Sequence, residues 1–108
     1  MPNFEELFSE LKTNMEDLVK LTVSNYKKEA LEDAKTFLES TKDKLKRWTE
    51  LLAAKQLSTE DFEWLVESQK DLAKMTLLKQ KGLAEIRIDQ FKKSLLNLIV
   101  DTVFNKVL

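Results

Sequence analysis

Apolar and small side chains recur every three or four residues along both halves of this 108-residue chain. The spacing averages about 3.7 residues from Phe4 to Leu52 and about 3.6 residues from Phe62 to Leu98. Such a spacing keeps the apolar side chains on one face of an undistorted α-helix. Because it is longer than the roughly 3.5-residue repeat of a left-handed coiled coil, we expect nearly straight helices. The pattern predicts two very long helices.

A capping sequence divides the chain almost in half. Ser58 fits the N-cap position of a helix, with a hydroxyl that can accept a hydrogen bond from an early backbone N–H. Asp61 follows at the third helical position, and Leu57 can pack against Phe62 one turn inside the helix. These residues predict a turn directly before position 59.

The rest of the chain contains few helix-breaking residues, with no proline beyond position 2 and one glycine, Gly82. We therefore predict an all-α fold with a single helical domain over residues 1–108, built as a long antiparallel two-helix hairpin. Its helices span about 3–56 and 59–107, joined by a turn at 56–58. At about 1.5 Å per residue, each helix would reach about 75 Å.

A turn centred on Leu57 makes residues at equal distances from it face each other. The predicted pairs are Trp48 with the Leu65/Val66 region, Tyr26 with Ile88, and Phe4 with Leu108. The two segments next to the turn carry opposite charge, which favours this pairing. Lys42 to Lys55 carries five basic and two acidic residues, or +3, whereas Ser58 to Asp71 carries one basic and five acidic residues, or −4.

Residues 95–107 carry more apolar surface than one hairpin can bury. Apolar side chains cover about two-thirds of this helix, whereas a hairpin hides one stripe per helix. We therefore expect the hairpin to form a homodimer or higher homo-oligomer with a four-helix core. The expected interface residues are Phe4, Phe8, Leu11, Trp64, Met75, Leu78, Leu95, Leu96, Leu98, Ile99, Val100, Val103 and Phe104.

A compact monomeric four-helix bundle is the alternative architecture. It requires additional helix breaks near Ser24-Asn25 and at Gly82. Two features disfavour these breaks. Lys27 and Lys28 would place positive charge in the first turn of the second helix, and Leu83-Ala84-Glu85 provides no N-cap for the fourth.

The composition excludes several kinds of chemistry. The chain has no cysteine and no histidine, so it cannot form disulfides, thiolate metal sites or histidine general bases. Its carboxylate pairs, such as Glu5/Glu6 and Glu16/Asp17, are adjacent on a helix and point about 100° apart. We predict a protein that is not an enzyme and has no catalytic, metal-binding or cofactor-binding residues.

These observations predict a non-enzymatic interaction or assembly protein that acts through self-association and a partner-binding apolar face. With 18 basic and 19 acidic residues, the net charge of −1 gives no global reason to bind nucleic acid. The alternative is a lipid- or membrane-surface-binding amphipathic protein, disfavoured by the weak charge beside the apolar arc. We expect a cytoplasmic location, because the absence of cysteine suits a reducing compartment. No apolar run approaches the roughly 20 residues of a membrane span.

Overall fold

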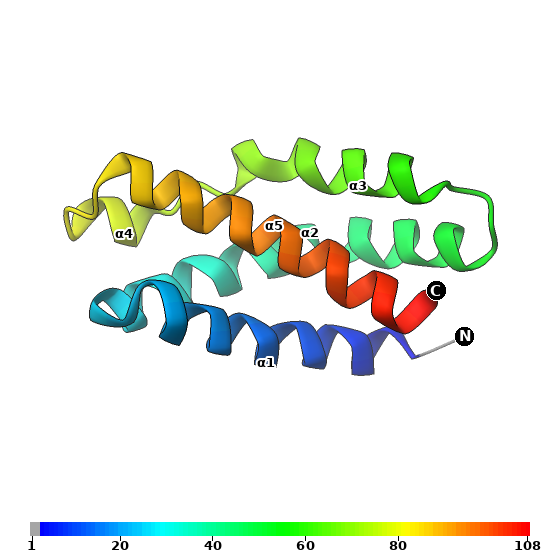
Figure 1. The fold of residues 1–108 in the computed structure, drawn as a ribbon, viewed down its shortest axis with the longest axis horizontal. Coiled ribbons are helices and arrows are strands. Elements are labelled where there is room, and N and C mark those ends of the chain that lie inside the picture. Colours follow the sequence, from blue (N-terminus) through cyan, green and yellow to red (C-terminus); the bar gives the residue numbers. More distant parts are fainter. Residues whose placement is uncertain (1–2) are drawn as a thin grey trace.

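The computed structural model describes residues 3–108, which form five α-helices and no β-strand. This part of the chain confirms the all-α prediction (Figure 1). The helices are α1 (Phe4–Thr22), α2 (Lys27–Ala53), α3 (Thr59–Glu67), α4 (Thr76–Gln80) and α5 (Glu85–Val107), with short 3-10 helices η1 (Ser24–Tyr26) and η2 (Ser68–Leu72).

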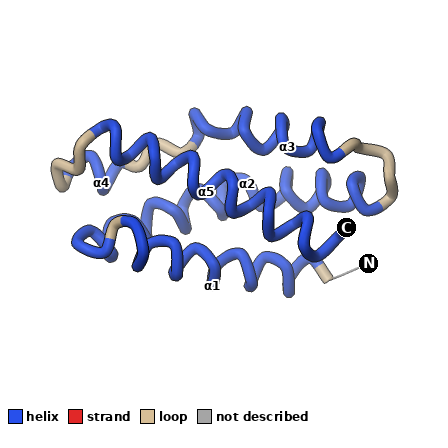
Figure 2. The backbone as a smooth tube through the Cα atoms, viewed as in Figure 1, coloured by secondary structure: helices blue, strands red, loops and turns tan. Residues whose placement is uncertain are grey.

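The four longer helices lie along the long axis of a globule of 43 × 23 × 19 Å (Figure 1). Helix α1 packs against α2, α2 against α3, α3 against α5, and α5 against α1, so these helices enclose a common core. The short helix α4 lies at the same end as the α1–α2 turn, whereas the α2–α3 turn lies near both termini (Figure 2). The radius of gyration is 13.7 Å, close to the roughly 13 Å of a compact 100-residue domain.

The predicted long hairpin is wrong in its helix lengths. The first predicted helix is divided between Thr22 and Lys27, and the second is interrupted at residues 73–75 and 81–84. Folding back at these points shortens the molecule from the predicted 75 Å or so to 43 Å. It also lets α1 and α5 cover sides of α2 and α3 that a single hairpin would expose. Burial of apolar area favours this arrangement over the extended hairpin.

The predicted register around Leu57 agrees with contacts near the turn and near the chain ends, whereas Arg87 bonds to Thr22 five positions out of register. Lys44 Nζ donates to Gln69 Oε1 at 3.3 Å, and these residues lie 13 and 12 positions from Leu57. Asn14 Nδ2 donates to Thr102 Oγ1 at 3.2 Å, and these lie 43 and 45 positions away. The hairpin is therefore doubled over, with its arms still paired side by side.

Two helices end in the same hydrogen-bonded motif. After α4, the Leu83 N–H donates to the Leu78 carbonyl at 3.2 Å and the Gly82 N–H to the Lys79 carbonyl at 3.0 Å, with Gly82 at φ +85°. After α2, Gln56 and Lys55 donate in the same way at 2.9 and 3.1 Å, but Lys55 occupies the left-handed position at φ 60°. Both ends are Schellman motifs, and only one has the glycine that this position favours.

The helix starts differ in how they are capped. The Asp61 N–H donates to Ser58 Oγ at 3.0 Å, which confirms the predicted N-cap of α3. The Glu5 N–H donates to Asn3 Oδ1 at 2.8 Å at the start of α1. The N-cap residues of α2 and α5 are Tyr26 and Ala84, and neither makes a side-chain cap. The sequence predicts this absence of capping, because neither residue is a favoured N-cap.

Helix α4 is capped by a residue from another helix. Asp33 of α2 is buried, and its two carboxylate oxygens accept from the Leu77 and Leu78 N–H groups at 3.1 and 2.8 Å. Met75, the residue before α4, is in the left-handed region at φ 50°. Met75 therefore lies between η2 and the start of α4, and the hydrogen bonds from α4 to Asp33 hold it in its strained conformation.

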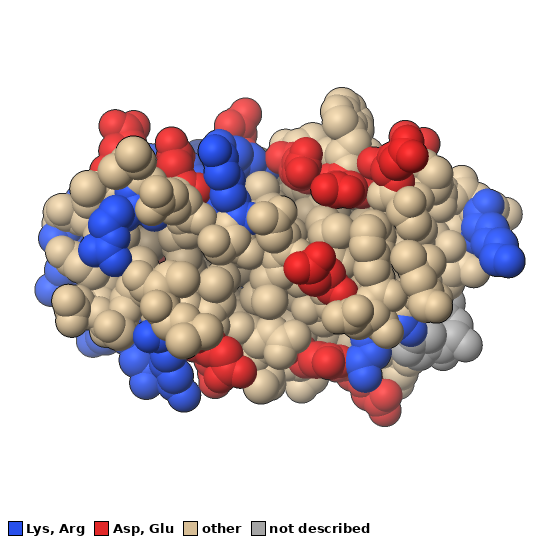
Figure 3. All heavy atoms as spheres, in the orientation of Figure 1, with Lys and Arg blue, Asp and Glu red and all other residues tan. Residues whose placement is uncertain are grey.

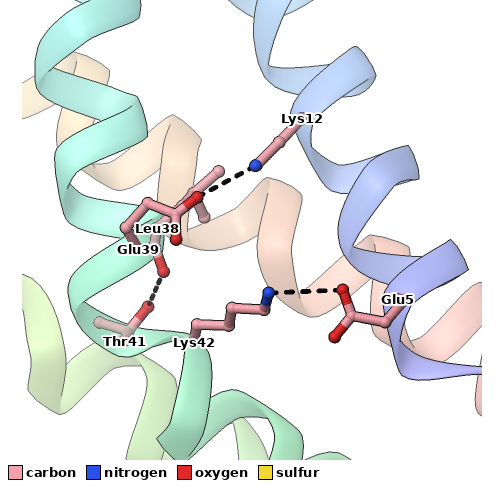
Figure 4. A network of polar contacts seen from close by, with 6 residues as sticks. All are labelled: Glu5, Lys12, Leu38, Glu39, Thr41 and Lys42. Atoms are coloured by element: carbon pink, nitrogen blue, oxygen red, sulfur yellow. Dashed lines mark hydrogen bonds and ion pairs between the residues drawn. The ribbon is translucent and has the colours of Figure 1, made fainter.

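A polar network joins the outer sides of α1 and α2 (Figure 4). Lys12 Nζ lies 3.0 Å from Glu39 Oε1, and Lys42 Nζ lies 3.4 Å from Glu5 Oε2. Both ammonium groups also lie over the Phe8 ring, 5.0 and 4.9 Å from its centroid. The hydrogen bond from Lys12, with nearby lysine charge, lowers the pKa of Glu39 below its ordinary value of 4.5.

Candidate interaction surface

Most of the predicted interface residues lie in the hydrophobic core of the single chain. The buried ones are Phe4, Phe8, Leu11, Met75, Leu78, Leu95, Leu96, Ile99, Val100 and Val103. Leu98 and Phe104 are half-buried and pack against the same core. The wide apolar arc of α5 is therefore covered by the chain's own helices, and its burial requires no partner.

Trp64 differs from the other predicted interface residues, because 67% of its side chain is exposed. It lies on α3, whose inner side is buried through Phe62 and Val66. Leu72, on η2, follows two turns later and is 46% exposed. Large apolar side chains occur singly on many protein surfaces, so the neighbours of Trp64 decide whether it belongs to a contact surface.

Half-buried apolar residues lie along the boundary between α2 and α3. Helical spacing places Lys44, Trp48 and Leu51 on one side of α2, and Asp61 and Leu65 on one side of α3. The hydrogen bond from Lys44 to Gln69 shows that these two sides adjoin. We call the outward side of this helix pair the α2/α3 surface. Its residues are Lys44, Arg47, Trp48, Leu51, Asp61, Trp64, Leu65 and Leu72.

The two sides of the α2/α3 surface carry opposite charge. Lys44, Lys46 and Arg47 are exposed on α2. The exposed carboxylates on α3 and η2 are Glu60, Asp61, Glu63, Glu67 and Asp71. Within residues 3–108, none of these eight charged groups forms an ion pair. The predicted opposition of charge is therefore present as two adjoining stripes, without direct pairing across the boundary.

A second group of exposed apolar residues lies at the opposite end of the molecule. Leu21, near the end of α1, is 84% exposed, and Ile86, at the start of α5, is 69% exposed. Arg87 Nη2 donates to the Thr22 carbonyl at 2.9 Å, which brings these two helix ends together. Leu21 also lines an open surface depression with Leu18 and Leu98.

Surface depressions on the molecule are shallow and open. One lies between α3 and α5 and is lined by Glu67, Lys70, Lys93, Leu96 and Asn97, with a volume of about 310 Å³. Another lies beside α4, where Phe37 and Met75 form part of its lining. Asp33 borders this second depression, but both of its oxygens already accept backbone hydrogen bonds. The first depression gathers one carboxylate and two ammonium groups at its rim.

Residues 3–108 contain no group of three acidic side chains arranged to hold a metal ion. No helix in this part of the chain combines the length and hydropathy needed to cross a membrane. Comparison with protein-family models, curated proteins and solved structures finds no match for this chain. Any functional inference for this chain therefore rests on the exposure, charge and shape of its surface.

Sequence periodicity singles out Trp64 and Ile86 as apolar positions off the main stripe, but it does not single out Leu21 or Leu72. Leu21 lies between Lys20 and Thr22, in a polar context that is a weak sign of exposure. Leu72 falls on the main apolar stripe, and only the 3-10 geometry of η2 turns it outward. Local geometry at the η2 break therefore decides the exposure of Leu72, whereas Leu21 is exposed because it lies away from the buried face of α1.

Proposed function

We propose that this chain is a non-enzymatic interaction and assembly protein that self-associates through the α2/α3 surface. The observation that carries the proposal is the exposed indole of Trp64 in the middle of α3. Tryptophan is enriched among the residues that dominate binding energy at protein interfaces, because its ring buries a large area with little loss of side-chain entropy. Trp48, Leu51 and Leu65 extend the apolar area around it.

The adjoining charge stripes favour a second copy of the chain as the partner. A two-fold axis places the same surface of both copies in contact. If α3 of one copy crosses α2 of the other, the acidic side of each copy meets the basic side of its partner. Lys44, Arg47 and Asp61 of this surface, which form no ion pair within residues 3–108, would then face opposite charges. Such complementarity directs association more than it strengthens it.

The size of the molecule is compatible with a modest dimer. A stable interface covers about 800 Å² on each partner, which is about 12% of the 6568 Å² surface of this chain. A surface made of two helices with half-buried apolar residues can supply part of this area. We therefore expect a weak, concentration-dependent dimer in the micromolar range or above.

Sedimentation velocity across a wide range of protein concentrations tests the proposal. The parent protein is expected to shift from monomer to dimer, and Trp64→Ala is expected to move this shift to higher concentration by about tenfold or more. Leu21→Ala, at the other end of the molecule, is the matched control and should leave the shift unchanged. A parent protein that stays monomeric at the highest concentration would contradict the proposal.

Charge reversal tests the arrangement of the two copies. Asp61→Lys and Arg47→Glu should each weaken the dimer, because each places like charges opposite one another. The double variant should recover much of the lost association, because its acidic and basic partners are exchanged rather than removed. Losses that simply add in the double variant would show that these residues do not face each other.

The lipid-surface alternative requires the molecule to open before its apolar arc can reach a membrane. It depended on the apolar arc of residues 95–107, and the structure buries Leu95, Leu96, Ile99, Val100 and Val103 in the core. Binding through this arc would require the helices to separate. The self-associating protein is therefore the function that we favour for the surface as it is folded.

A further inference from the structure

The end of the molecule opposite the α2–α3 turn is strongly basic. It is formed by residues 20–29 and 74–87, which carry seven basic and two acidic side chains, or +5. Because the whole chain has a net charge of −1, the remaining residues carry −6. The small net charge of the whole chain therefore conceals a separation of positive from negative charge along the long axis. We call this region the basic end.

Several contacts bring the two segments of the basic end together. Arg87 of α5 donates to the Thr22 carbonyl at the end of α1. Lys81 Nζ lies 3.9 Å from Glu29 Oε1, and Asp33 holds the start of α4 on α2. Figure 1 shows α4, the α1–α2 turn and the start of α5 side by side at this end. In Figure 3, most of the Lys and Arg side chains on the visible face lie toward it.

Most of the basic groups at this end are available to a ligand. Lys81 is the one member that forms an ion pair with another described residue, and Arg87 is engaged with a backbone carbonyl. The remaining five are exposed and have no ion-pair partner within residues 3–108. They are Lys20, Lys27, Lys28, Lys74 and Lys79.

The basic end also projects aliphatic side chains into solvent. Among residues 3–108, Leu21 and Ile86 are the most exposed large apolar residues apart from Leu108, and Leu77 of α4 is partly exposed at the same end. Aliphatic tips surrounded by lysines suit the interface of an anionic bilayer, where the tips enter the acyl-chain boundary and the ammonium groups remain among the headgroups. Nucleic acid would use the same charge but would gain little from Leu21 and Ile86, because base stacking requires aromatic rings.

We infer that the basic end is a docking site for an anionic lipid surface, with Leu21 and Ile86 as shallow anchors and the lysines as the electrostatic contact. This inference does not rest on the proposed self-association, because Leu21, Ile86 and the lysines of the basic end lie outside the α2/α3 surface. The negative charge on the remaining residues orients the molecule with its basic end toward the membrane.

Vesicle flotation tests the inference. The parent protein should float with vesicles of phosphatidylcholine and phosphatidylserine at low ionic strength, and much less at physiological ionic strength. It should not float with vesicles of phosphatidylcholine alone. Absence of flotation with the anionic vesicles at low ionic strength would overturn the inference, as would tighter binding to single- or double-stranded DNA than to these vesicles.

Two pairs of matched variants locate the contact. Lys28→Glu/Lys79→Glu should weaken vesicle binding by about tenfold or more, whereas Lys55→Glu/Lys93→Glu, with the same change in net charge, should leave it nearly unchanged. Leu21→Gln/Ile86→Gln should weaken binding several-fold, and Leu108→Gln should not. Circular dichroism checks that each variant is folded. Equal losses in the two charge-reversed variants would show that only net charge matters and would overturn the assignment to this end.

Discussion

The two ends of the molecule connect helices by different physical means. At one end, α2 and α3 are joined by a short turn whose bonds are local: the Schellman motif at Lys55 and the Ser58 cap each lie within six residues of their partners. At the other end, the start of α4 is held by Asp33, which lies 44 positions before Leu77 in the chain. Arg87 likewise bonds to Thr22, 65 positions away.

This difference shows how a chain with few helix breakers can fold compactly. The α2–α3 turn can form before the rest of the molecule, because its hydrogen bonds need no distant partner. Local interactions give little support to the helix breaks at the basic end. The N-cap residues Tyr26 and Ala84 make no side-chain cap, and Met75 has a strained backbone. Long-range hydrogen bonds and burial of apolar residues across the doubled hairpin compensate for these local costs.

The largest expected effect is the loss of the Asp33 cap. Asp33→Ala leaves two backbone N–H groups of α4 without their acceptors, one of them buried, and should lower the free energy of unfolding by about 3 kcal/mol. Ser58→Ala, the matched cap removal at the other end, should cost about 1 kcal/mol. Urea unfolding measures both. Equal costs would contradict the distinction between the ends.

Hydrogen exchange sharpens the same comparison. Asp33→Ala should accelerate amide exchange in residues 73–84 well before the molecule unfolds globally, whereas Ser58→Ala should affect only the first turn of α3. Asp33→Asn should lie between the parent and Asp33→Ala, because its side chain keeps one carbonyl oxygen as an acceptor. An unchanged exchange pattern would show that α4 is held mainly by packing.

A smaller loss is expected at Gly82. Its φ of +85° is unfavourable for any residue with a Cβ, although a Cβ built there would meet no atom within 4 Å. Gly82→Ala should therefore destabilise the protein by about 1 kcal/mol through backbone strain alone. Thermal melts of the variant provide the measurement. A much larger loss would indicate that the loop makes contacts beyond those seen in the structure.

Lys55 offers the reverse test at the opposite end. It occupies the same left-handed position of a Schellman motif, so Lys55→Gly should stabilise the protein by roughly 0.5–1 kcal/mol. The gain is reduced because glycine also increases the entropy of the unfolded chain. A loss of stability instead would show that the Lys55 side chain contributes more than its backbone strain costs.

The smallest effect is expected away from both ends, at Glu39. The hydrogen bond from Lys12 lowers the Glu39 pKa, so the stabilisation is present above the ordinary carboxyl pKa of 4.5 and is lost as pH falls through the lowered value. Glu39→Gln should slightly flatten the fall in melting temperature between neutral pH and about pH 3. Because the pair is exposed to solvent and screened, the difference at neutral pH should be small.

The sequence by itself determined the helical class, the Ser58 cap and the antiparallel pairing of α2 and α3 next to the turn. These depend on periodicity and on contacts within a few residues, which are readable without the fold. Trp64 was also identifiable, because it lies off the apolar stripe of its helix. The acidic and basic segments on the two sides of the turn could be read from the chain, but their arrangement as adjoining stripes could not.

Only the tertiary structure decided where the hairpin folds back. Val23 and Ala73 are not helix-breaking residues. Burial of the apolar surface of α5 on folding back outweighs the local cost of ending the helices there. The same event buried ten of the predicted interface residues and gathered two distant lysine-rich segments at one end. Periodicity identifies which face of a helix is apolar. It cannot say whether a second chain or the same chain covers that face, because both bury the same side chains.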